Sequence, residues 1–530
     1  MLPTPSSSPV HGSIIAKGSR ALSNRTNIPS LFNPLPTPPK DSCQKRAYDD
    51  ADSSRRKRPR LFKNTKCTQE SLTESEGESD VEMEDVKVEI ARARRGTMFN
   101  SMQSRIMHPW GSFARPHMTT RPILESFVSS QKADVYPCEE RDEGYALTVP
   151  YACCFSNASK EGKESRLAFA TERGTIHIAN TSRRNAWDQE PPRTTFQAHF
   201  NGVFDIKWSP DDTMLATASA DQTAGITCPI SSSALSCLRG HTSTIKCVAW
   251  DPHHRQILST GSRDGTICLW DLRTSGPSDD DGTTYLAPVI TLPGAHDETK
   301  KTRGRKSKNA PTAPSITSLL YPNLEPCQLM SSGSGDGILK CWDIRQCVTS
   351  KRSKAPYTLF SSALDPTTFH GSRRPRGITS IVNGHRATDG LIFALGTDSY
   401  VHTYSAQDLA PQSHGYTDEN MSTNFYVRLA LSPCGRWLAS GGAGPQATAF
   451  LYDVSNAGRP ATSDGGGPVP SVKLGGQAGD INAVDWAEDV LATCADDGTV
   501  RVWRPDLDVR RACEEDSEEK KWEWRWAIRP

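Results

Sequence analysis

Two stretches of the chain follow one plan: GSRDGTICLWDLR at residues 261–273 and GSGDGILKCWDIR at residues 333–345. Each starts with small residues, turns at Asp-Gly, continues as a strand-like run and ends in Trp-Asp with an arginine two places further on. Glycine permits the positive φ of a tight turn, and period-two alternation is typical of a β-strand. Each stretch therefore predicts two antiparallel strands joined by a tight turn.

The plan recurs along the chain from about residue 145. Further copies occupy residues 216–227, 394–405 and 492–503, and weaker copies occupy residues 168–180 and 439–453. The turns of the strong copies hold Asp221, Asp264, Asp336, Asp398 and Asp497. Repetition of short strands and tight turns is the WD-repeat pattern, in which ~4–8 four-stranded blades close into a ring. We expect an all-β fold, a seven-bladed WD-repeat β-propeller with a disordered N-terminal extension.

The repeated aspartates, histidines and tryptophans have a structural explanation. Buried polar groups need hydrogen-bond partners. In the unit at residues 240–273 we expect one buried set made of Asp264, His241, Trp270 and either Ser259 or Thr260. These residues would hold the blade together.

Ring closure needs an outer strand for the last blade, and two segments are candidates. One is RPILESFVSS at residues 121–130, and the other is KKWEWRWAI at residues 520–528. Trp522, Trp524 and Trp526 would share one strand face, as period two requires, and we favour the C-terminal segment. Polar insertions near residues 275–315 and 350–375 are expected to be loops.

Composition divides the chain further. Its 530 residues are 35% hydrophobic, below the ~45–50% (glycine included) of compact domains. We expect three parts: a disordered region at 1–84, a helical or extended lead-in at 85–144 with a possible helix at 85–107, and the propeller at 145–530. The net charge of +1 points to neither nucleic acid nor membrane. No apolar run approaches the ~20 residues of a membrane span, and no signal core begins the chain, which predicts a soluble intracellular protein.

Enzyme and metal signals are weak. The fifteen cysteines include no C-x-x-C pair, which argues against a zinc ribbon or a disulfide framework. The Gly-rich segments lack the Gly-Lys-Ser/Thr of a phosphate loop, and no nucleophile motif occurs. We expect no catalytic residue, no metal and no cofactor.

The N-terminal region carries three features. Thr37 and Ser8 precede prolines and are candidate phosphorylation sites. Arg55, Arg56, Lys57 and Arg58 lie in a basic run that predicts nuclear import. An acidic run at residues 70–85 is expected to be solvated.

The two arginines after Trp-Asp predict an interface. Six residues separate Asp264 from Trp270, which is about 20 Å of strand, so Arg273 leaves the sheet at the rim opposite the Asp turn. Arg345 does the same on the next blade. Arginine offers a fork of donors that suits docking. The candidate docking residues are Trp270, Asp271, Arg273, Trp342, Asp343 and Arg345.

Paired W-D-x-R motifs resemble the docking signature of substrate receptors for cullin-four RING ubiquitin ligases. Within that class the chain resembles the denticleless (Cdt-two) family. The resemblance rests on GTMFNSM, AHFNGVFDIKW, ADQTA, GAHDETKK and TNFYVRLALSP, in order, together with the two W-D-x-R stretches, and it runs from about Gly96 to Arg504. It implies a non-catalytic, nuclear receptor whose arginines contact the damaged-DNA-binding adaptor that joins it to the cullin. Its targets would be degron proteins bound to PCNA, such as the licensing factor Cdt-one.

The resemblance also implies a degron with a basic residue. We expect it at the face opposite the arginines, where turn carboxylates gather. The candidates are Glu172, Arg173, Arg263 and Asp496. Gln103–Trp110 only faintly resembles a clamp-binding box. Two alternatives stay open: a nuclear scaffold for chromatin or histone assembly, and a direct nucleic-acid binder using the basic loop 300–308, although no direct nucleic-acid contact is expected.

Overall fold

The computed structural model describes residues 120–139, 147–280, 282–297, 313–322, 325–345, 358–369, 372–445, 448–458 and 471–528. All of them belong to the second of two compact units, Ser112–Pro530. The phosphorylation, import and acidic segments, the possible helix at 85–107, Gln103–Trp110 and the loop at 300–308 lie outside the described residues. The described part is mainly β-structure, which confirms the all-β expectation.

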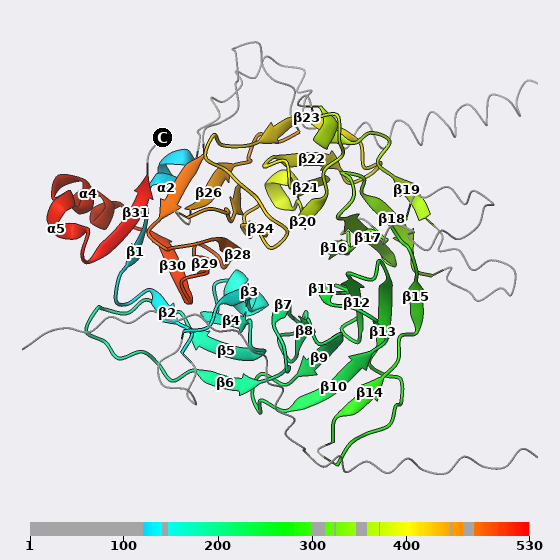
Figure 1. The fold of residues 1–530 in the computed structure, drawn as a ribbon. Coiled ribbons are helices and arrows are strands. Elements are labelled where there is room, and N and C mark those ends of the chain that lie inside the picture. The colour runs from blue at the N-terminus through cyan, green and yellow to red at the C-terminus, as the bar shows by residue number, and fades with distance from the viewer. Residues whose placement is uncertain are drawn as a thin grey trace, which may run out of the picture. The chain divides into compact units, whose positions relative to one another are not determined.

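Sheets of mainly antiparallel strands are arranged in a ring (Figure 1). Residues of their inner strands line a cavity at the centre of the ring, and the axis through it is called here the channel. Four sheets have four strands each. They are β3 (Pro150–Phe155), β4 (Arg166–Thr171), β5 (Thr175–Asn180) and β6 (Thr194–Gln197); β11 (Ile245–Trp250), β12 (Ile257–Ser262), β13 (Ile267–Asp271) and β15 (Ile290–Leu292); β16 (Ile316–Leu320), β17 (Gln328–Gly333), β18 (Lys340–Asp343) and β19 (Thr358–Ser361); and β20 (Ile378–Asn383), β21 (Leu391–Gly396), β22 (Val401–Ser405) and β23 (Pro411–Tyr416).

Two sheets are larger. The first has five strands: β7 (Val203–Trp208), β8 (Leu215–Ser219), β9 (Thr223–Thr227), β10 (Ala234–Arg239) and β14 (Thr284–Leu286). The second has ten strands: β24 (Leu429–Leu431), β25 (Trp437–Ser440), β26 (Thr448–Asp453), β27 (Val472–Gly475), β28 (Ile481–Trp486), β29 (Leu491–Ala495), β30 (Thr499–Pro505), β1 (Phe127–Ser130), β2 (Val135–Pro137) and β31 (Trp524–Ile528).

The helical segments are short. They are α2 (Arg121–Glu125), α3 (Asn157–Lys160), α4 (Leu507–Glu515), α5 (Ser517–Lys520) and the 3₁₀ turns Pro366–Thr368 and Arg386–Thr388. None of the helices in the described ranges is long and apolar enough to cross a membrane.

The second strand of each sheet is deeply buried because neighbouring sheets cover it on both faces, and several of these strands contain small residues. Every residue of β8, β25 and β29 is buried. Gly261 in β12 shows how close the approach is: an added Cβ would lie 2.5 Å from Cγ2 of Ile316 in the next sheet. Small residues therefore permit tight face-to-face packing.

Apolar clusters lie between consecutive units around the channel. Within the described residues there are seven of them. One joins Trp270 of β13 to Ala216 of β8, and another joins Trp342 of β18 to Ile267 of β13. The core is thus a series of inter-sheet layers rather than one central mass.

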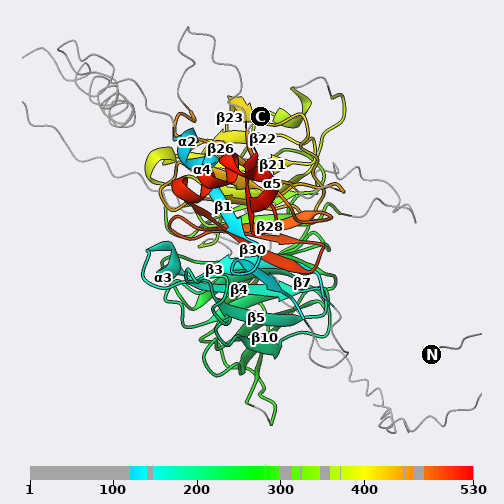
Figure 2. The same ribbon diagram turned by 90° about the vertical axis from the view of Figure 1, so that its left-hand side faces the viewer.

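Both ends of the described chain take part in closure. Strand β1 pairs with β30, Val128 lying opposite Arg504, and β31 then pairs with the other edge of β1, Trp526 lying opposite Val128. Strand β31 also pairs with β27, which joins two four-stranded parts into the ten-stranded sheet. Figure 2 shows β1 beside β30. The preference for the C-terminal segment as the outer strand is therefore wrong, because β1 takes that place.

The closing segments also differ from the expected strands in detail. Residues 121–125 form α2 rather than a strand, and Pro122 suits the first turn of a helix. Strand β31 begins at Trp524, and Trp522 before it is exposed. In the expected lead-in, residues 127–137 supply β1 and β2, both paired with β30.

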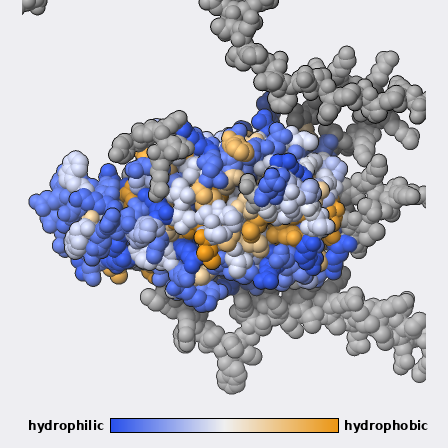
Figure 3. Space-filling model, turned by 90° about the horizontal axis from the view of Figure 1, so that it is seen from below, coloured by the Kyte–Doolittle hydropathy of each residue, from blue (hydrophilic) through white to orange (hydrophobic). Residues whose placement is uncertain are grey.

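Part of each predicted loop insertion is β-structure. Residues 284–286 form β14, which pairs in parallel with β10, and residues 290–292 form β15, the outer strand beside β13. Residues 358–361 form β19. The expectation that these segments are loops throughout is wrong for β14, β15 and β19. An outer strand needs only main-chain pairing with its neighbour, so it tolerates the polar side chains of these segments. Seen from below, the rim is mostly hydrophilic with apolar patches (Figure 3).

The expected buried set is present in the unit at residues 240–273, with Thr260 as its centre. The Thr260 hydroxyl accepts a hydrogen bond from Nε1 of Trp270 at 2.8 Å and lies 2.7 Å from Nε2 of His241. On its other side His241 lies 3.5 Å from the Asp264 carboxylate. Burial alone would lower the pKa of His241, but Asp264 and Cys268 outweigh it and raise that pKa to about 9.

Other units vary this set. In the last unit Gln477 replaces histidine, and it accepts a hydrogen bond from the Thr493 hydroxyl, which in turn accepts one from Trp503. In the unit of β7–β10 His199 bonds Asp221 and Thr217. A small hydroxyl residue on the second strand is the common element.

We predict that Thr260→Val lowers the free energy of unfolding by about 2–4 kcal/mol, because it leaves the indole N–H and an imidazole nitrogen buried without a partner. Denaturant unfolding measures this. Thr291→Val, at an exposed position of β15, is the matched control and should cost less than about 0.5 kcal/mol. Equal stability of the two variants would contradict this account.

Candidate functional site: two faces of the ring

The strand register separates two faces of the ring. On β12, Ser262 lies opposite Ile245 and next to the Asp264 turn, whereas Leu258 lies opposite both Trp250 and Trp270. The Asp turns therefore lie on one face, called here the turn face. The W-D-x-R motifs lie on the other, called here the arginine face.

Arg273 is held in a fixed, outward position by Asp271. Its Nε and Nη2 donate to the two carboxylate oxygens of Asp271 at 2.8 and 2.7 Å, and its backbone N–H donates to Oδ1 at 3.0 Å. These bonds hold the pKa of Asp271 below its usual range. The side chain is still 66% exposed, so further guanidinium N–H groups face solvent.

Arg345 repeats this arrangement on the neighbouring sheet. Its Nε and Nη2 lie 3.2 and 3.3 Å from the oxygens of Asp343, and its backbone N–H donates to Oδ1 at 2.9 Å. Burial raises the pKa of Asp343, but the bonds from Arg345 lower it overall. The Arg345 side chain is 54% exposed. The two arginines are thus pre-oriented by the same local geometry.

The tryptophans of the two motifs are not surface residues. Trp270 and Trp342 are buried, and each donates its indole N–H at 2.8 Å, to Thr260 and Ser331 respectively. They can anchor the end of the strand that carries the arginine. The arginine is the exposed member of each motif, whereas Asp343 is itself buried.

The channel is hollowed at the arginine face. A cavity of about 340 Å³ is lined by Trp208 and Trp250 at the ends of β7 and β11, by Tyr321, and by the ion pair of Lys160 with Asp485 at 3.2 Å. Lys207 also lines this cavity, and it lies 3.6 Å from Asp205.

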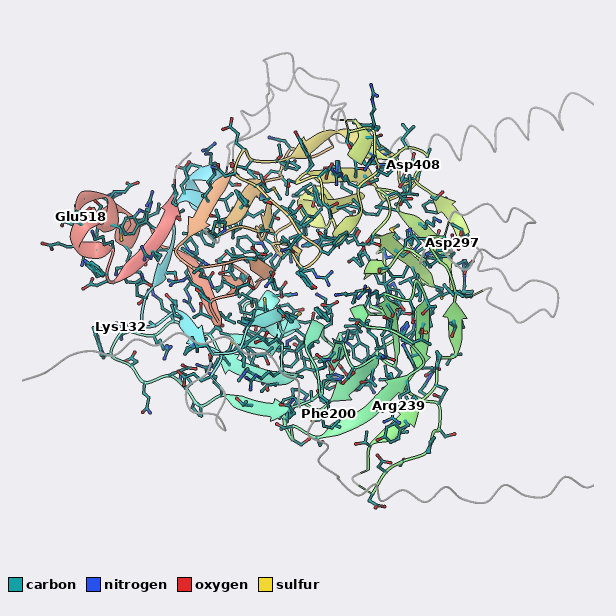
Figure 4. All side chains as sticks on the ribbon, viewed as in Figure 1. Lys132, Phe200, Arg239, Asp297, Asp408 and Glu518 are labelled. Carbon is teal, nitrogen blue, oxygen red and sulfur yellow. The ribbon has the colours of Figure 1, made fainter. Side chains whose placement is uncertain are left out.

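The channel mouth at the turn face is built from equivalent positions. Side chains from several sheets reach toward the middle of the ring (Figure 4). The second residue of each inner strand, or the residue just before β24, contributes to this layer: Tyr151, Phe204, Lys246, Thr317, Thr379, Arg428 and Asn482. Sequence analysis missed this layer, although aligning the inner-strand patterns GVFDIKW, TIKCVAW and YVRLALS would have brought Phe204, Lys246 and Arg428 together.

Three aromatic rings stack on one another at this mouth, those of Tyr151, Phe204 and Tyr426. Tyr151 stacks on Phe204 at 5.4 Å between centroids and 4° between planes, and Tyr426 stacks on Phe204 at 5.8 Å. Lys246 Nζ lies 3.6 Å from the centroid of Phe204 and 4.8 Å from that of Tyr426. Tyr426 is 44% exposed, so the group opens to solvent.

Carboxylates gather on one side of this mouth. Glu172 approaches the Tyr151 hydroxyl and the backbone N–H of Val149 at long distances of 3.5 Å. Asp496 is exposed, but its carboxylate already accepts hydrogen bonds from the Asn482 side chain at 2.7 Å and from the backbone N–H of Asp480 at 3.1 Å. Asp497 bonds Thr499 and Ala478, which is the expected turn role.

The two predicted turn arginines are exposed on the same face. Arg173 follows Glu172 in the tight turn before β5, and its carbonyl accepts a bond from Gln197. Arg263 donates its backbone N–H to Thr244, just before Lys246. Arg263 thus lies on the Lys246 side of the mouth, and Arg173 on the Glu172 side.

Comparison with known proteins identifies the repeats and the relatives. Residues 190–226, 232–271 and 469–504 match the family described as "WD domain, G-beta repeat". Denticleless protein homolog A of Xenopus laevis is 31% identical over 406 residues, covering 73% of this chain and 52% of the relative. Cell division cycle protein cdt2 of Schizosaccharomyces pombe is 31% identical over 420 residues, covering 76% of each. Denticleless protein homolog of Homo sapiens is 29% identical over 426 residues, covering 77% of this chain and 53% of the relative.

Matched repeats and antiparallel sheets around a channel, with Asp turns tied to buried hydroxyl groups, define an all-β WD-repeat propeller. The chain belongs to the denticleless/cdt2 family of WD-repeat proteins. It spans about half the length of the vertebrate relatives named above.

Proposed function

We propose that the chain is the substrate-recognition subunit of a cullin-four RING ubiquitin ligase. In this proposal the damaged-DNA-binding adaptor docks on the arginine face, and degron proteins bound to PCNA, such as Cdt-one, dock on the turn face. Ubiquitin is transferred by the rest of the ligase, and the chain itself needs no cofactor. Family membership supports this role, and the fission yeast relative is named for the cell division cycle.

The observation that carries the proposal is the pair of exposed arginines. Arg273 and Arg345 come from neighbouring sheets, and each is fixed by an aspartate two residues before it. A side chain already held in one orientation loses less conformational entropy on docking. Arginine is also enriched among the residues that dominate interface energies. Two such groups, repeated on one face, suit a protein partner.

We further propose a seven-bladed ring in which the ten-stranded sheet supplies two blades. One is β24–β27, and the other is β28–β30 with β1 as its outer strand; β31 bridges them. The seven inter-sheet clusters support this count. We also propose a nuclear location, with import directed by Arg55, Arg56, Lys57 and Arg58.

We predict that Arg273→Glu with Arg345→Glu weakens adaptor binding by more than about 100-fold, since each reversal removes an interface charge and adds a repulsive one. Affinity for the purified adaptor measures this. Thermal stability should fall only modestly, because both arginine side chains are exposed and the buried Asp343 keeps the backbone N–H of residue 345 as a donor.

The control for this experiment is Arg511→Glu, which reverses an equally exposed arginine of α4. It should bind the adaptor like wild type. Wild-type adaptor affinity of the double variant would refute the docking assignment.

We place the degron on the turn face, where Glu172 and Asp496 can receive its basic residue. A charge-assisted hydrogen bond to a carboxylate is stronger than a neutral one, and the rings of Tyr151 and Tyr426 lie beside Glu172. Arg173 and Arg263 are positioned to receive acidic or backbone groups of the target.

We predict that Glu172→Lys or Asp496→Lys weakens binding of the PCNA-loaded Cdt-one degron peptide by about 10-fold or more, because each places a like charge near the basic residue. Fluorescence anisotropy measures the affinity. Glu518→Lys on α5, which is 85% exposed, is the control. If neither turn-face variant differs from this control, the degron binds elsewhere.

A further inference from the structure

Three cationic residues lie near the channel mouth on the turn face. Lys246 lies against Phe204 and Tyr426, Arg428 donates from Nη2 to the carbonyl of Lys246 at 2.8 Å, and Arg263 follows the β12 strand that pairs with the Lys246 strand. In the described part of the chain, none of the three forms an ion pair with a carboxylate. We call these three residues the mouth cations.

Arg428 is fixed where it lies. Its Nη1 donates to the carbonyls of Thr317 at 3.0 Å and Thr379 at 3.1 Å, while Nη2 reaches Lys246. One guanidinium therefore ties together the inner strands of three sheets. Main-chain carbonyls accept three hydrogen bonds from its five N–H donors, but they do not neutralise its charge.

The two carboxylates on the described inner strands have other partners. Asp205 accepts a bond from the backbone of Val248 at 3.0 Å and lies 3.6 Å from Lys207. Asp485 pairs with Lys160 and accepts from the backbone of Phe155 at 2.7 Å. These pairs leave the mouth cations without a neutralising partner from the inner strands.

The clustering of positive charge is unfavourable, as the pKa of Lys246 indicates. Burial, together with the charges of Arg428 and Arg263, lowers the pKa of Lys246 to about 8. Like charges held close together destabilise the folded protein. A bound anion would relieve the repulsion between these positive charges. Because Arg428 is already held in place, binding would also lose little conformational entropy.

We propose that Lys246, Arg263 and Arg428 form a site for one anionic group, a carboxylate or a phosphate ester, carried by the peptide that docks on the turn face. The inference rests on the proposed function and adds a second charge requirement to it. The peptide would place its anion at the mouth cations and its basic residue near Glu172.

The charges around the mouth favour a peptide over a nucleic acid. Glu172 approaches the Tyr151 hydroxyl at the mouth. Tyr151 stacks on the ring of Phe204, and Lys246 lies over that same ring. Asp480 and Asp496 lie on the same side as Glu172. A continuous phosphate backbone crossing the mouth would meet these carboxylates, whereas a peptide with one anion and one cation matches both sides.

The test uses the full chain and the PCNA-loaded Cdt-one degron peptide, with each Asp or Glu of the peptide replaced in turn by Asn or Gln. Lys246→Gln should weaken binding about 10-fold or more, in line with a charge-assisted bond. One of the amide-substituted peptides should bind the wild-type chain about 10-fold more weakly than the original peptide. The same substitution should cause no further loss of affinity in the Lys246→Gln variant. Replacing that acidic residue by phosphoserine should restore binding if phosphate is accepted.

Two variants control for damage to the fold. Lys246→Arg keeps the charge and should bind like wild type, and Lys163→Gln removes a lysine that is 70% exposed and should have no effect. Equal binding by Lys246→Gln and wild type overturns the anion site, even where Glu172→Lys still abolishes binding and the proposed function stands.

A second probe covers the case in which the degron peptide does not bind the wild-type chain, which would refute the proposed function. Inorganic phosphate is then titrated while the NMR signal of the Lys246 ammonium is followed. A saturable shift, absent in Lys246→Gln, supports the anion site, and no shift overturns it. Single-stranded DNA binding that depends on Lys246 would assign the mouth cations to nucleic acid and overturn the peptide proposal.

Discussion

The pairing of β1 with β30 is the constraint on which the rest of the structure depends. It joins Val128 to Arg504 and Phe127 to Pro505, near opposite ends of the described chain. Closure over so long a separation costs chain entropy, but it covers a sheet edge that would otherwise be unpaired. Strand β31 then covers the second edge of β1 and ties it to β27. The helices α4 and α5 lie beside this junction outside the ring, where Glu518 of α5 is labelled (Figure 4).

Closure turns a row of similar sheets into two faces with different chemistry. Each sheet contributes the turn between its second and third strands to one face and the end of its third strand to the other. Arg273 and Arg345 gain their orientation from local Asp partners, but their placement on one face comes from the ring. At the opposite face the ring brings Tyr151, Lys246 and Arg428 together from sheets far apart in sequence. A propeller can therefore serve two partners without moving.

Local patterns were enough to predict the parts of the fold that local chemistry determines. The Asp-Gly turns and the buried Trp270 follow from spacing, and period two explains why Thr260 and not Ser259 meets Trp270: Thr260 lies on the same strand face as Leu258, which is opposite Trp270. The closing strand was not predictable in this way, because both termini have strand-like sequences and only long-range pairing chooses between them. The channel mouth was missed for a similar reason, since Phe204, Lys246 and Arg428 meet only in three dimensions.

The central claim is that adaptor and degron bind opposite faces of one closed ring. The most direct measurement is the affinity of the full chain for the PCNA-loaded degron peptide, with and without saturating adaptor. We predict that the two dissociation constants agree within about twofold, because the two proposed sites lie at opposite ends of the strands. Displacement of the peptide by the adaptor would contradict it, since competition requires both partners to occupy the same face.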